Sequence, residues 1–385
     1  MAQLAGFRGA LWDRAKADVD KLALAPIDVP GKLAAGELVR DATRAVYRYH
    51  VSFPTNRRTI TRKSLICAVG LEPWSEGTIR PHEASEPQAR AAALQRFTKA
   101  GAYDEPVLAG YRDPGGEIER LFRSVDSGKP VIKTTTADGT EHKLWRVSSA
   151  EVLGTLRRLF APRKIHVLDG HARYEAMLEY RASLGELSMY SSANYGLFCL
   201  VDLAEPALVV APRHRIVRGA FERDAVLAAV KPWFEIDKLA DAATSPDKQR
   251  AALAATVAHQ PAFVVVFAGD KDAYKLMLKP DVSPVNEGVA VHRAVQKYDP
   301  VVVDKLFLER GAPGAQVTAE LDLAAVGAQV HGGQASLGVI MRPLSLEQIV
   351  HADEVGELLP ASSDAFFPSL VNFVGYVVDR DEDVV

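Results

Sequence analysis

The strongest constraint on the fold is a glycine at an abrupt change of hydrophobic period. Residues 164–168 form a short strand pattern, and residues 169–171 form a tight loop around Gly170. The following residues, 173–184, carry Tyr174, Met177 and Leu178 at helical spacing. With the strands and helices that alternate elsewhere in the chain, this junction predicts a fold of the α/β (α+β) class.

The same junction predicts an anion site. Backbone N–H groups at the start of a helix point toward one spot, and the positive end of the helix dipole reinforces them. Asp169, Gly170, His171 and Arg173 therefore form a candidate phosphate-binding loop, with His171 and Arg173 as side-chain donors. Spacing alone leaves an alternative open, in which Asp169 caps the helix and Arg173 pairs with Glu179 or solvent.

Charge and apolar patterning exclude several classes of protein. The 46 basic and 49 acidic residues give a net charge of −3, so no bulk positive field draws in nucleic acid or an anionic membrane. A DNA-binding function is further disfavoured because no helix-turn-helix with a basic recognition helix is evident. No stretch approaches 18 apolar residues, and the start of the chain lacks a secretory pattern, so we expect a cytoplasmic protein.

The length of 385 residues is enough for two or three domains, and turn residues suggest the boundaries. We expect an N-terminal region (1–60), a nucleotide-phosphate-binding core (61–205) and a C-terminal α+β region (206–385). Cys67 and Cys199 lie in apolar runs and are expected to be core residues.

The hydrophobic periodicity also predicts the individual elements. Helices are predicted over 11–24, 86–99, 117–125, 149–160, 173–184, 223–234, 299–310 and 346–355. Strands are predicted over 45–53, 65–70, 107–111, 164–168, 195–202 paired with 207–210, 262–267, 273–278, 337–341 and 370–378, with a hairpin over 131–147.

A second polar motif, Pro81-His82-Glu83, lies just before the helix predicted over 86–99. We predict that Ser85 caps this helix, with Pro87 in its first turn and Gln88 completing a capping box. His82 and Glu83 are equally well explained as a solvated loop pair, because an acidic residue near a helix start is favoured by the dipole. No histidine has a typical metal-ligand spacing, so no metal site is assigned.

These two motifs together resemble a known superfamily. The run Asp169-Gly170-His171-Ala172-Arg173 is similar to the Asp-Gly-His-His-Arg phosphate loop of SerK-like proteins in the ParB/sulfiredoxin superfamily. The same proteins carry a Pro-His-Glu motif before a helix and a strand, as found here at residues 81–83. Most of the chain also resembles the bacterial family of unknown function number 1015, over residues 25–29, 65–83, 144–146, 212–215 and 356–368.

The resemblance implies a ParB/sulfiredoxin-like core with additional N-terminal and C-terminal α+β layers, and a nucleotide-dependent phosphotransferase acting on a small hydroxyl compound such as free serine. Glu83 would be the base with His82 beside it, ATP or ADP the donor, and Mg²⁺ the bridge between phosphates with Asp169 as a helper. The expected partners are a nucleotide and a small-molecule substrate, with a homodimer left open and neither nucleic acid nor membrane.

The chain also departs from the family pattern. Ala172 replaces the second histidine, Ser362 stands where lysine is usual, and the segment between Val29 and Val46 is short. Loss of a buried, paired cation from a phosphate site weakens binding by about 1–3 kcal/mol. A non-catalytic nucleotide sensor, or a degenerate member without turnover, is therefore the alternative function.

Overall fold

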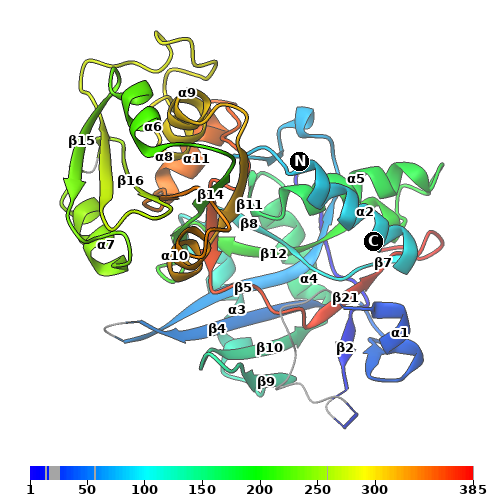
Figure 1. The fold of residues 1–385 in the computed structure, drawn as a ribbon. Coiled ribbons are helices and arrows are strands. Elements are labelled where there is room, and N and C mark those ends of the chain that lie inside the picture. The colour runs from blue at the N-terminus through cyan, green and yellow to red at the C-terminus, as the bar shows by residue number, and fades with distance from the viewer. Residues whose placement is uncertain (14, 17–26, 56–57, 258, 385) are drawn as a thin grey trace. The chain divides into compact units, whose positions relative to one another are not determined.

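The computed structural model describes residues 1–13, 15–16, 27–55, 58–257 and 259–384 (Figure 1). The chain is a mixed α and β protein with several sheets, as the sequence predicts. In the described part of the chain, no helix is both long enough and apolar enough to cross a lipid bilayer.

The chain divides into two compact units, and each is described by itself. Unit 1 comprises Met1–Pro81, Ser85–Val209 and Phe366–Val385. Unit 2 comprises His82–Ala84 and Val210–Ala365. The three-part division expected from the sequence stays a prediction.

A nine-stranded mixed sheet forms the centre of unit 1. Its strands are, in order across the sheet, β6 (Ile79–Arg80), β11 (Ile165–Asp169), β8 (Val107–Tyr111), β12 (Tyr195–Asp202), β5 (Thr59–Gly70), β4 (Val46–Pro54), β10 (Glu141–Val147) and β9 (Ile132–Thr135), with β1 (Leu4–Ala5) also paired to β5. β11 runs parallel to β6 and β12 parallel to β8, whereas the remaining pairs are antiparallel. Every β12 residue before Asp202 is buried, as in a strand covered on both faces.

The helices of unit 1 pack on this sheet through their apolar faces. α5 (His171–Ser183) contacts β8 and packs along α2 (Pro87–Ala100), and the two helices lie side by side in Figure 1. α3 (Glu117–Asp126) contacts β4, β10 and α4 (Ala150–Phe160), whose N-cap residue is Ser149. Two short 3-10 helices, η2 (Trp74–Glu76) and η3 (Ser192–Asn194), complete the unit.

A second sheet of unit 1 corrects the prediction for the start of the chain. Its strand order is β3 (Leu38–Arg40), β2 (Ala10–Trp12), β21 (Val374–Val377) and β7 (Ala102–Tyr103), with α1 (Val29–Ala34) nearby. The helix predicted over 11–24 is wrong at residues 11–12, and most of its remainder lies outside the described residues. β2 is a strand because it pairs with β3 and with β21, more than 350 residues away, which local periodicity does not reveal.

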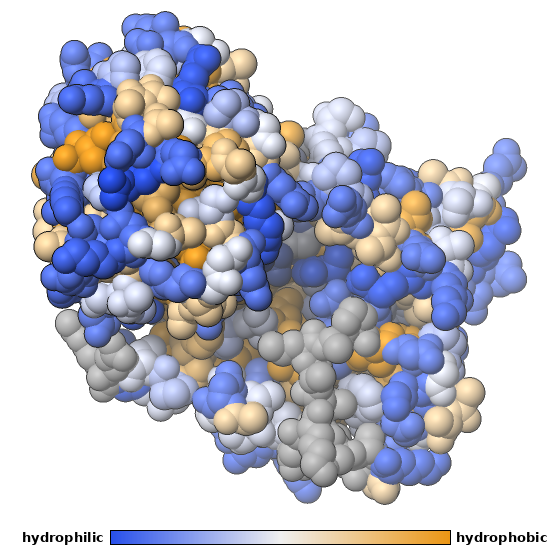
Figure 2. All heavy atoms as spheres, in the orientation of Figure 1, coloured by the Kyte–Doolittle hydropathy of each residue, from blue (hydrophilic) through white to orange (hydrophobic). Residues whose placement is uncertain are grey.

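Unit 2 is built on a six-stranded antiparallel sheet. Its strands are, in order, β15 (Phe234–Leu239), β17 (Ala273–Leu278), β16 (Ala262–Phe267), β19 (Leu337–Ile340), β14 (His214–Arg218) and β18 (Gln316–Glu320). The predicted hairpin of β16 and β17 is confirmed. On the face drawn in Figure 2, apolar and hydrophilic residues of unit 2 are interspersed.

The helices of unit 2 are α6 (Arg223–Val230), α7 (Pro246–Ala254), α10 (Leu323–His331), α11 (Leu346–Glu354) and a continuous helical run of α8 (Asp299–Val301), a π-helical segment η4 (Val302–Leu308) and α9 (Glu309–Gly311). α10 packs on β14, β16 and β19, and α7 on β16 and β17. A Cβ at Gly338 of β19 would lie 2.5 Å from Val326 of α10. Glycine is therefore required for this close approach of helix and sheet.

One strand pair differs from the prediction. β13 (Val209–Pro212) pairs with β20 (Asp364–Phe367), whereas residues 207–210 were expected to pair with 195–202. β12 already has partners on both edges, β5 and β8, so no edge is left for a third strand. The expected positions of Cys67 and Cys199 are confirmed, since both are fully buried and burial raises the pKa of each thiol.

Candidate functional site

The predicted phosphate loop is the turn from β11 into α5. Gly170 is the N-cap residue of α5, with a φ of 97°, and it supplies no side-chain cap to this end of the helix. Asp169 is the last residue of β11, so the N-cap position belongs to Gly170 and not to Asp169. A residue with a Cβ is disfavoured at this φ, which explains the glycine.

Arg173 folds back over this turn. A Cβ at Gly170 would meet the Arg173 guanidinium at 2.8 Å, so the two groups are in close contact. The Arg173 Nη2 lies 3.4 Å from Asp169 Oδ2 and donates to the Pro106 carbonyl at 3.3 Å, and Nη1 lies 3.8 Å from Glu105 Oε2. Burial lowers the pKa of Arg173, but the charges of Asp169 and Glu105 raise it above its usual value. Arg173 is therefore a firmly cationic group beside the start of α5.

Asp169 and His171 lie in different surroundings. The Asp169 side chain is 48% exposed, so its carboxylate is accessible from solvent. His171 is only 3% exposed, which places its ring in the interior rather than on the surface of the loop. Of the loop side chains, Asp169 and Arg173 are thus the more accessible to a ligand.

The start of α2 corrects a prediction and reveals contacts that the sequence did not suggest. Its N-cap is Glu86, without a side-chain hydrogen bond, although Pro87 occupies the first turn as expected. Ser85 instead donates its hydroxyl to Glu175 of α5. Glu175 also accepts from Trp74 at 3.2 Å, and Arg90 pairs with Glu175 and Glu179 at 3.3 and 3.2 Å. The capping box is therefore wrong because Ser85 bonds to a tertiary partner 90 residues away.

His82 and Glu83 of the second predicted motif lie in unit 2. Ala84 donates its N–H to the Leu359 carbonyl, and Leu359 donates to the His82 carbonyl, both at 2.9 Å. His82 is 1% exposed, and its Nε2 lies 2.9 Å from Asp364 Oδ2. The half-buried Glu83 carboxylate accepts the Ser363 N–H at 2.8 Å. The explanation of His82 and Glu83 as a solvated loop pair therefore does not describe these residues.

His82, Glu83 and Asp364 form a cluster with the geometry of three metal ligands. One candidate ligand atom from each lies within 4.8 Å of the other two. The sequence did not predict this group, because Asp364 lies 282 residues after His82. The only signal was the position of the Pro-His-Glu motif, which does not identify its distant partner. Imidazole with two carboxylates suits a transition metal, whereas the exposed Asp169 carboxylate supplies the oxygen that Mg²⁺ prefers.

Ser362, which stands where the family pattern has lysine, has a structural role in unit 2. It adopts a φ of 57°, and its carbonyl accepts Arg215 Nη1 at 2.8 Å. Arg215 is 2% exposed and is held by Asp304 through bonds of 2.9 and 2.8 Å. This arginine stabilises the segment that carries Ser363 and Asp364, and the sequence analysis did not identify it.

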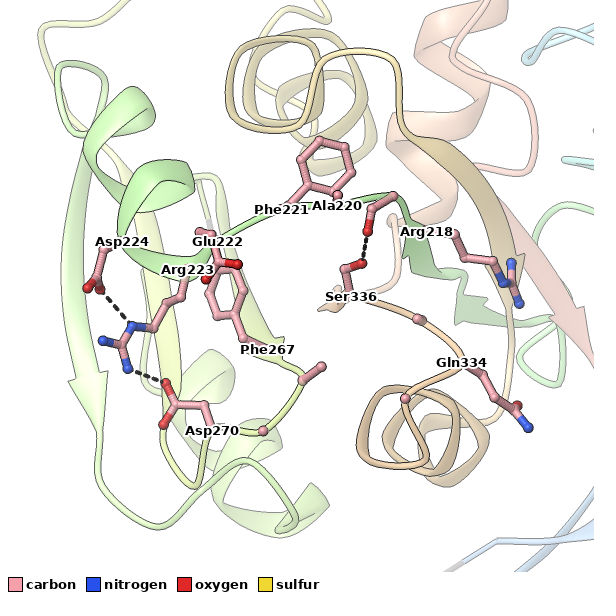
Figure 3. A pocket seen from close by; sticks show the side chains of 15 residues that line it. Arg218, Ala220, Phe221, Glu222, Arg223, Asp224, Phe267, Asp270, Gln334 and Ser336 are labelled. Atoms are coloured by element: carbon pink, nitrogen blue, oxygen red, sulfur yellow. Dashed lines mark hydrogen bonds and ion pairs between the residues drawn. The ribbon is translucent and has the colours of Figure 1, made fainter.

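A hollow of about 690 Å³ in unit 2 was also not predicted (Figure 3). Arg223 lines it and pairs with Asp224 and Asp270, each at 2.8 Å. Ser336 donates its hydroxyl to the Gly219 carbonyl, and both residues line the same hollow. Among the polar side chains labelled there, Arg223, Asp224 and Asp270 bond to one another. This arrangement favours a structural role.

The predicted site residues thus form two groups. Asp169, Gly170, His171 and Arg173 are together in unit 1, and His82 and Glu83 are together with Asp364 in unit 2. Each group is ordered by contacts within its own unit. Their joint action stays a prediction.

Solved structures of similar proteins have low identity to this chain. A conserved hypothetical protein from Pyrococcus furiosus is 11% identical, with a TM-score of 0.40, over 81% of this chain and 93% of its own. A free serine kinase in complex with AMP is 12% identical, with a TM-score of 0.40, over 83% and 91%. A C-terminally truncated SbnI from Staphylococcus aureus is 13% identical, with a TM-score of 0.38, over 83% and 91%. Likeness at this level does not establish a shared activity.

Family membership is clearer. No curated protein matches the chain. A family model described as "Protein of unknown function (DUF1015)" matches residues 28–306, more than half of the chain. The late block at residues 356–368, which includes Ser362, lies outside the match. The prediction of this family from the sequence is confirmed: the chain belongs to the DUF1015 family of proteins of unknown function.

Proposed function

We propose that this protein is a nucleotide-dependent phosphotransferase that acts on a small hydroxyl compound such as free serine. The loop Asp169–Arg173 would hold the nucleotide phosphates, and Glu83 would accept the proton of the attacking hydroxyl with His82 beside it. The observation that carries the proposal is the start of α5, where the Arg173 guanidinium lies against Gly170, an N-cap residue that has no side chain of its own to cap the helix. Such an end attracts phosphate.

The partners of Arg173 support this assignment. Its contacts with Asp169 and Glu105, at 3.4 and 3.8 Å, are longer than close charge-assisted hydrogen bonds of about 2.7–2.9 Å. Within the described part of the chain, the Arg173 Nε has no hydrogen-bond partner. A bound phosphate can therefore form shorter hydrogen bonds with the Arg173 guanidinium than Asp169 and Glu105 do. A Mg²⁺ ion, when bound, would neutralise phosphate charge, and the exposed Asp169 carboxylate would be its ligand.

The surroundings of Glu83 support its assignment as the base. The Ser363 N–H donates to one carboxylate oxygen and orders the side chain, and in this proposal the carboxylate approaches the substrate hydroxyl. His82 is fixed by Asp364, so it is an ordered neighbour. In this proposal the hydroxyl oxygen attacks the terminal phosphorus, Glu83 takes the hydroxyl proton, and the nucleotide leaves with one phosphate fewer.

A nucleotide sensor without turnover is the second candidate. It is favoured by Ser362, which stands where the family pattern has a cationic lysine. The carbonyl of Ser362 accepts a hydrogen bond from Arg215. It is also favoured by the burial of His171, which leaves Arg173 as the cationic side chain of the loop. Both candidates require nucleotide binding at Asp169–Arg173, and they differ in the role of Glu83.

One experiment separates the candidates. The full chain is incubated with ATP or ADP, Mg²⁺ and a panel of serine and other hydroxyl compounds, and phosphorylated products are sought by mass spectrometry. We expect Glu83→Gln to lower turnover by about 10²–10⁴-fold, the usual contribution of a general base, with little change in nucleotide affinity. Glu347→Gln, at an exposed position of unit 2, is the control.

Nucleotide affinity is measured by calorimetry on the same proteins. We expect Arg173→Ala to weaken binding by about 10-fold or more, because it removes a charge-assisted hydrogen bond. Arg181→Ala, near the other end of α5, should leave the affinity unchanged. Binding without any product would favour the sensor. If the wild-type protein binds no nucleotide, both candidates are wrong.

A further inference from the structure

A cavity of about 860 Å³ lies within unit 2, apart from every residue that the proposed function uses. Its walls come from β14, α7, the residues around the start of α8, and the segment that runs from β19 into α11. We name it the His214 cavity. Its volume falls within the range of small-molecule sites, about 300–1,000 Å³.

The floor of the His214 cavity is apolar. Its buried side chains are Leu253, Leu323, Ile340, Met341 and Leu344, each at most 5% exposed. These residues belong to or adjoin the core between the sheet, α7 and α10. A ligand with an apolar body would bury its surface here.

His214 adds a polar group to this apolar wall. The ring is 4% exposed, and its Nδ1 accepts the Met341 N–H at 3.1 Å. Burial, with the nearby charges of Arg250 and Arg215, lowers the pKa of His214 to about 4, so the ring is neutral at pH 7. Its proton must then lie on Nε2, for which the described residues offer no acceptor. The ring thus has one hydrogen-bond donor available to a ligand.

The charged residues that line the cavity are mainly cationic. Asp299 is the acidic one among the described lining residues, and Arg342 neutralises it through bonds of 2.9 and 3.1 Å. The Lys297 Nζ contacts the Pro280 carbonyl at 3.4 Å, and Arg250 lies 3.7 Å from the almost fully exposed Asp247. Lys297 and Arg250 therefore leave positive charge at the cavity, unlike Arg223 in the hollow of Figure 3.

We propose that the His214 cavity binds a small organic carboxylate with an apolar body. The carboxylate would accept from His214 Nε2 and face Lys297 and Arg250, while the apolar body would lie on the floor. This site is independent of the proposed phosphotransferase, since its residues are separate from Glu83 and from the Asp169–Arg173 loop.

The test uses three probes with the full chain at pH 7.5, measured by calorimetry and ligand-observed NMR. Octanoate has both features, acetate lacks the apolar body, and octylammonium has the opposite charge. We expect octanoate to bind at least 10-fold more tightly than either of the others. Across butanoate, hexanoate and octanoate, affinity should rise by up to about fourfold per methylene. Equal binding of all three probes would overturn the proposal.

Variants then locate the binding. Ala254→Trp should fill the cavity and lower octanoate affinity at least 10-fold, whereas Ala251→Trp, exposed on the same helix but outside the cavity, should not. Lys297→Gln should weaken octanoate about threefold or more, with Lys231→Gln as the exposed control. Octanoate binding that is unchanged in both Ala254→Trp and Lys297→Gln would place the ligand elsewhere.

Discussion

Arg173 in unit 1 and Arg342 in unit 2 both face carboxylates at candidate ligand sites, yet their geometries differ. Arg342 holds Asp299 through two bonds of 2.9 and 3.1 Å, and the Asp299 side chain is 9% exposed. Arg173 lies 3.4 Å from Asp169, whose side chain is 48% exposed. Short bonds to a buried partner make an arginine part of the structure, whereas long contacts to an exposed partner leave it able to bind a ligand.

The first prediction tests whether the Asp299–Arg342 pair is structural. Asp299→Ala leaves the Arg342 guanidinium partly buried without its carboxylate, so we expect a loss of about 3–5 kcal/mol in the free energy of unfolding. Urea unfolding of the full chain measures it. Asp247→Ala, with a side chain that is 98% exposed, should change stability by less than about 1 kcal/mol. Equal effects of the two variants would show that the Asp299–Arg342 pair contributes no more to stability than the exposed Asp247 does.

The second prediction concerns acid stability. His214 in unit 2 and His142 in unit 1 both have pKa values lowered to about 4 by burial. A neutral buried histidine favours the folded state above pH 6.5, and its contribution is lost as the unfolded chain takes up the proton between pH 6.5 and 4. For each residue the full loss is about 3 kcal/mol. The free energy of unfolding, measured with urea, should therefore fall less steeply between pH 7 and 4 in His214→Asn and in His142→Asn than in the wild-type protein. An unchanged slope would show that folding does not lower the pKa of the ring.

The third prediction concerns the close contact between Gly170 and Arg173. Gly170→Ala adds a Cβ at a φ of 97° and crowds the guanidinium, so it should destabilise the protein by more than the roughly 1–2 kcal/mol of left-handed strain alone. Gly185→Ala, just beyond the other end of α5, has a φ of 76° and nothing within 4 Å of its Cβ, so it should show the strain alone. The difference in unfolding free energy isolates the Arg173 contact. Equal losses would place Arg173 away from Gly170.

The smallest expected effect compares helix caps. Ser345 forms a capping box with Gln348 at α11, and Ser149 caps α4 through a single bond to Val152 of 3.4 Å. Each Ser→Ala change should lower stability by roughly 0.5–2 kcal/mol, with the larger loss at Ser345. Thermal unfolding of the two variants measures the difference. A larger loss at Ser149 would contradict the comparison.

Local patterns predicted the elements whose partners are close in sequence. The β16–β17 hairpin agrees with its prediction because an apolar run, the turn at Gly269 and Asp270, and a second run specify it locally. α4 was likewise predicted from the apolar spacing of its own residues. In contrast, the pairing of β2 with β21 and of β13 with β20 depends on segments that are distant in sequence.

The candidate site follows the same rule. The turn at Gly170 was predicted because strand, glycine and helix are consecutive residues. The contacts of His82 with Asp364, of Glu83 with Ser363, and of Arg173 with Glu105 were missed, since tertiary structure alone brings these residues together. The His214 cavity was missed for the same reason, because its walls come from five separate stretches of chain between residues 212 and 348.

Unit 1 is built from chain segments that come before and after unit 2, and this order affects how unit 1 folds during translation. Unit 1 ends at Val209, unit 2 follows, and the chain returns to unit 1 only at Phe366. A nascent chain that has emerged from the ribosome up to residue 365 still lacks β21, the strand that joins β2 to β7. The four-stranded sheet therefore closes only after residues 374–377 have emerged, so until then the edges of β2 and β7 are open to chaperones and to wrong partners.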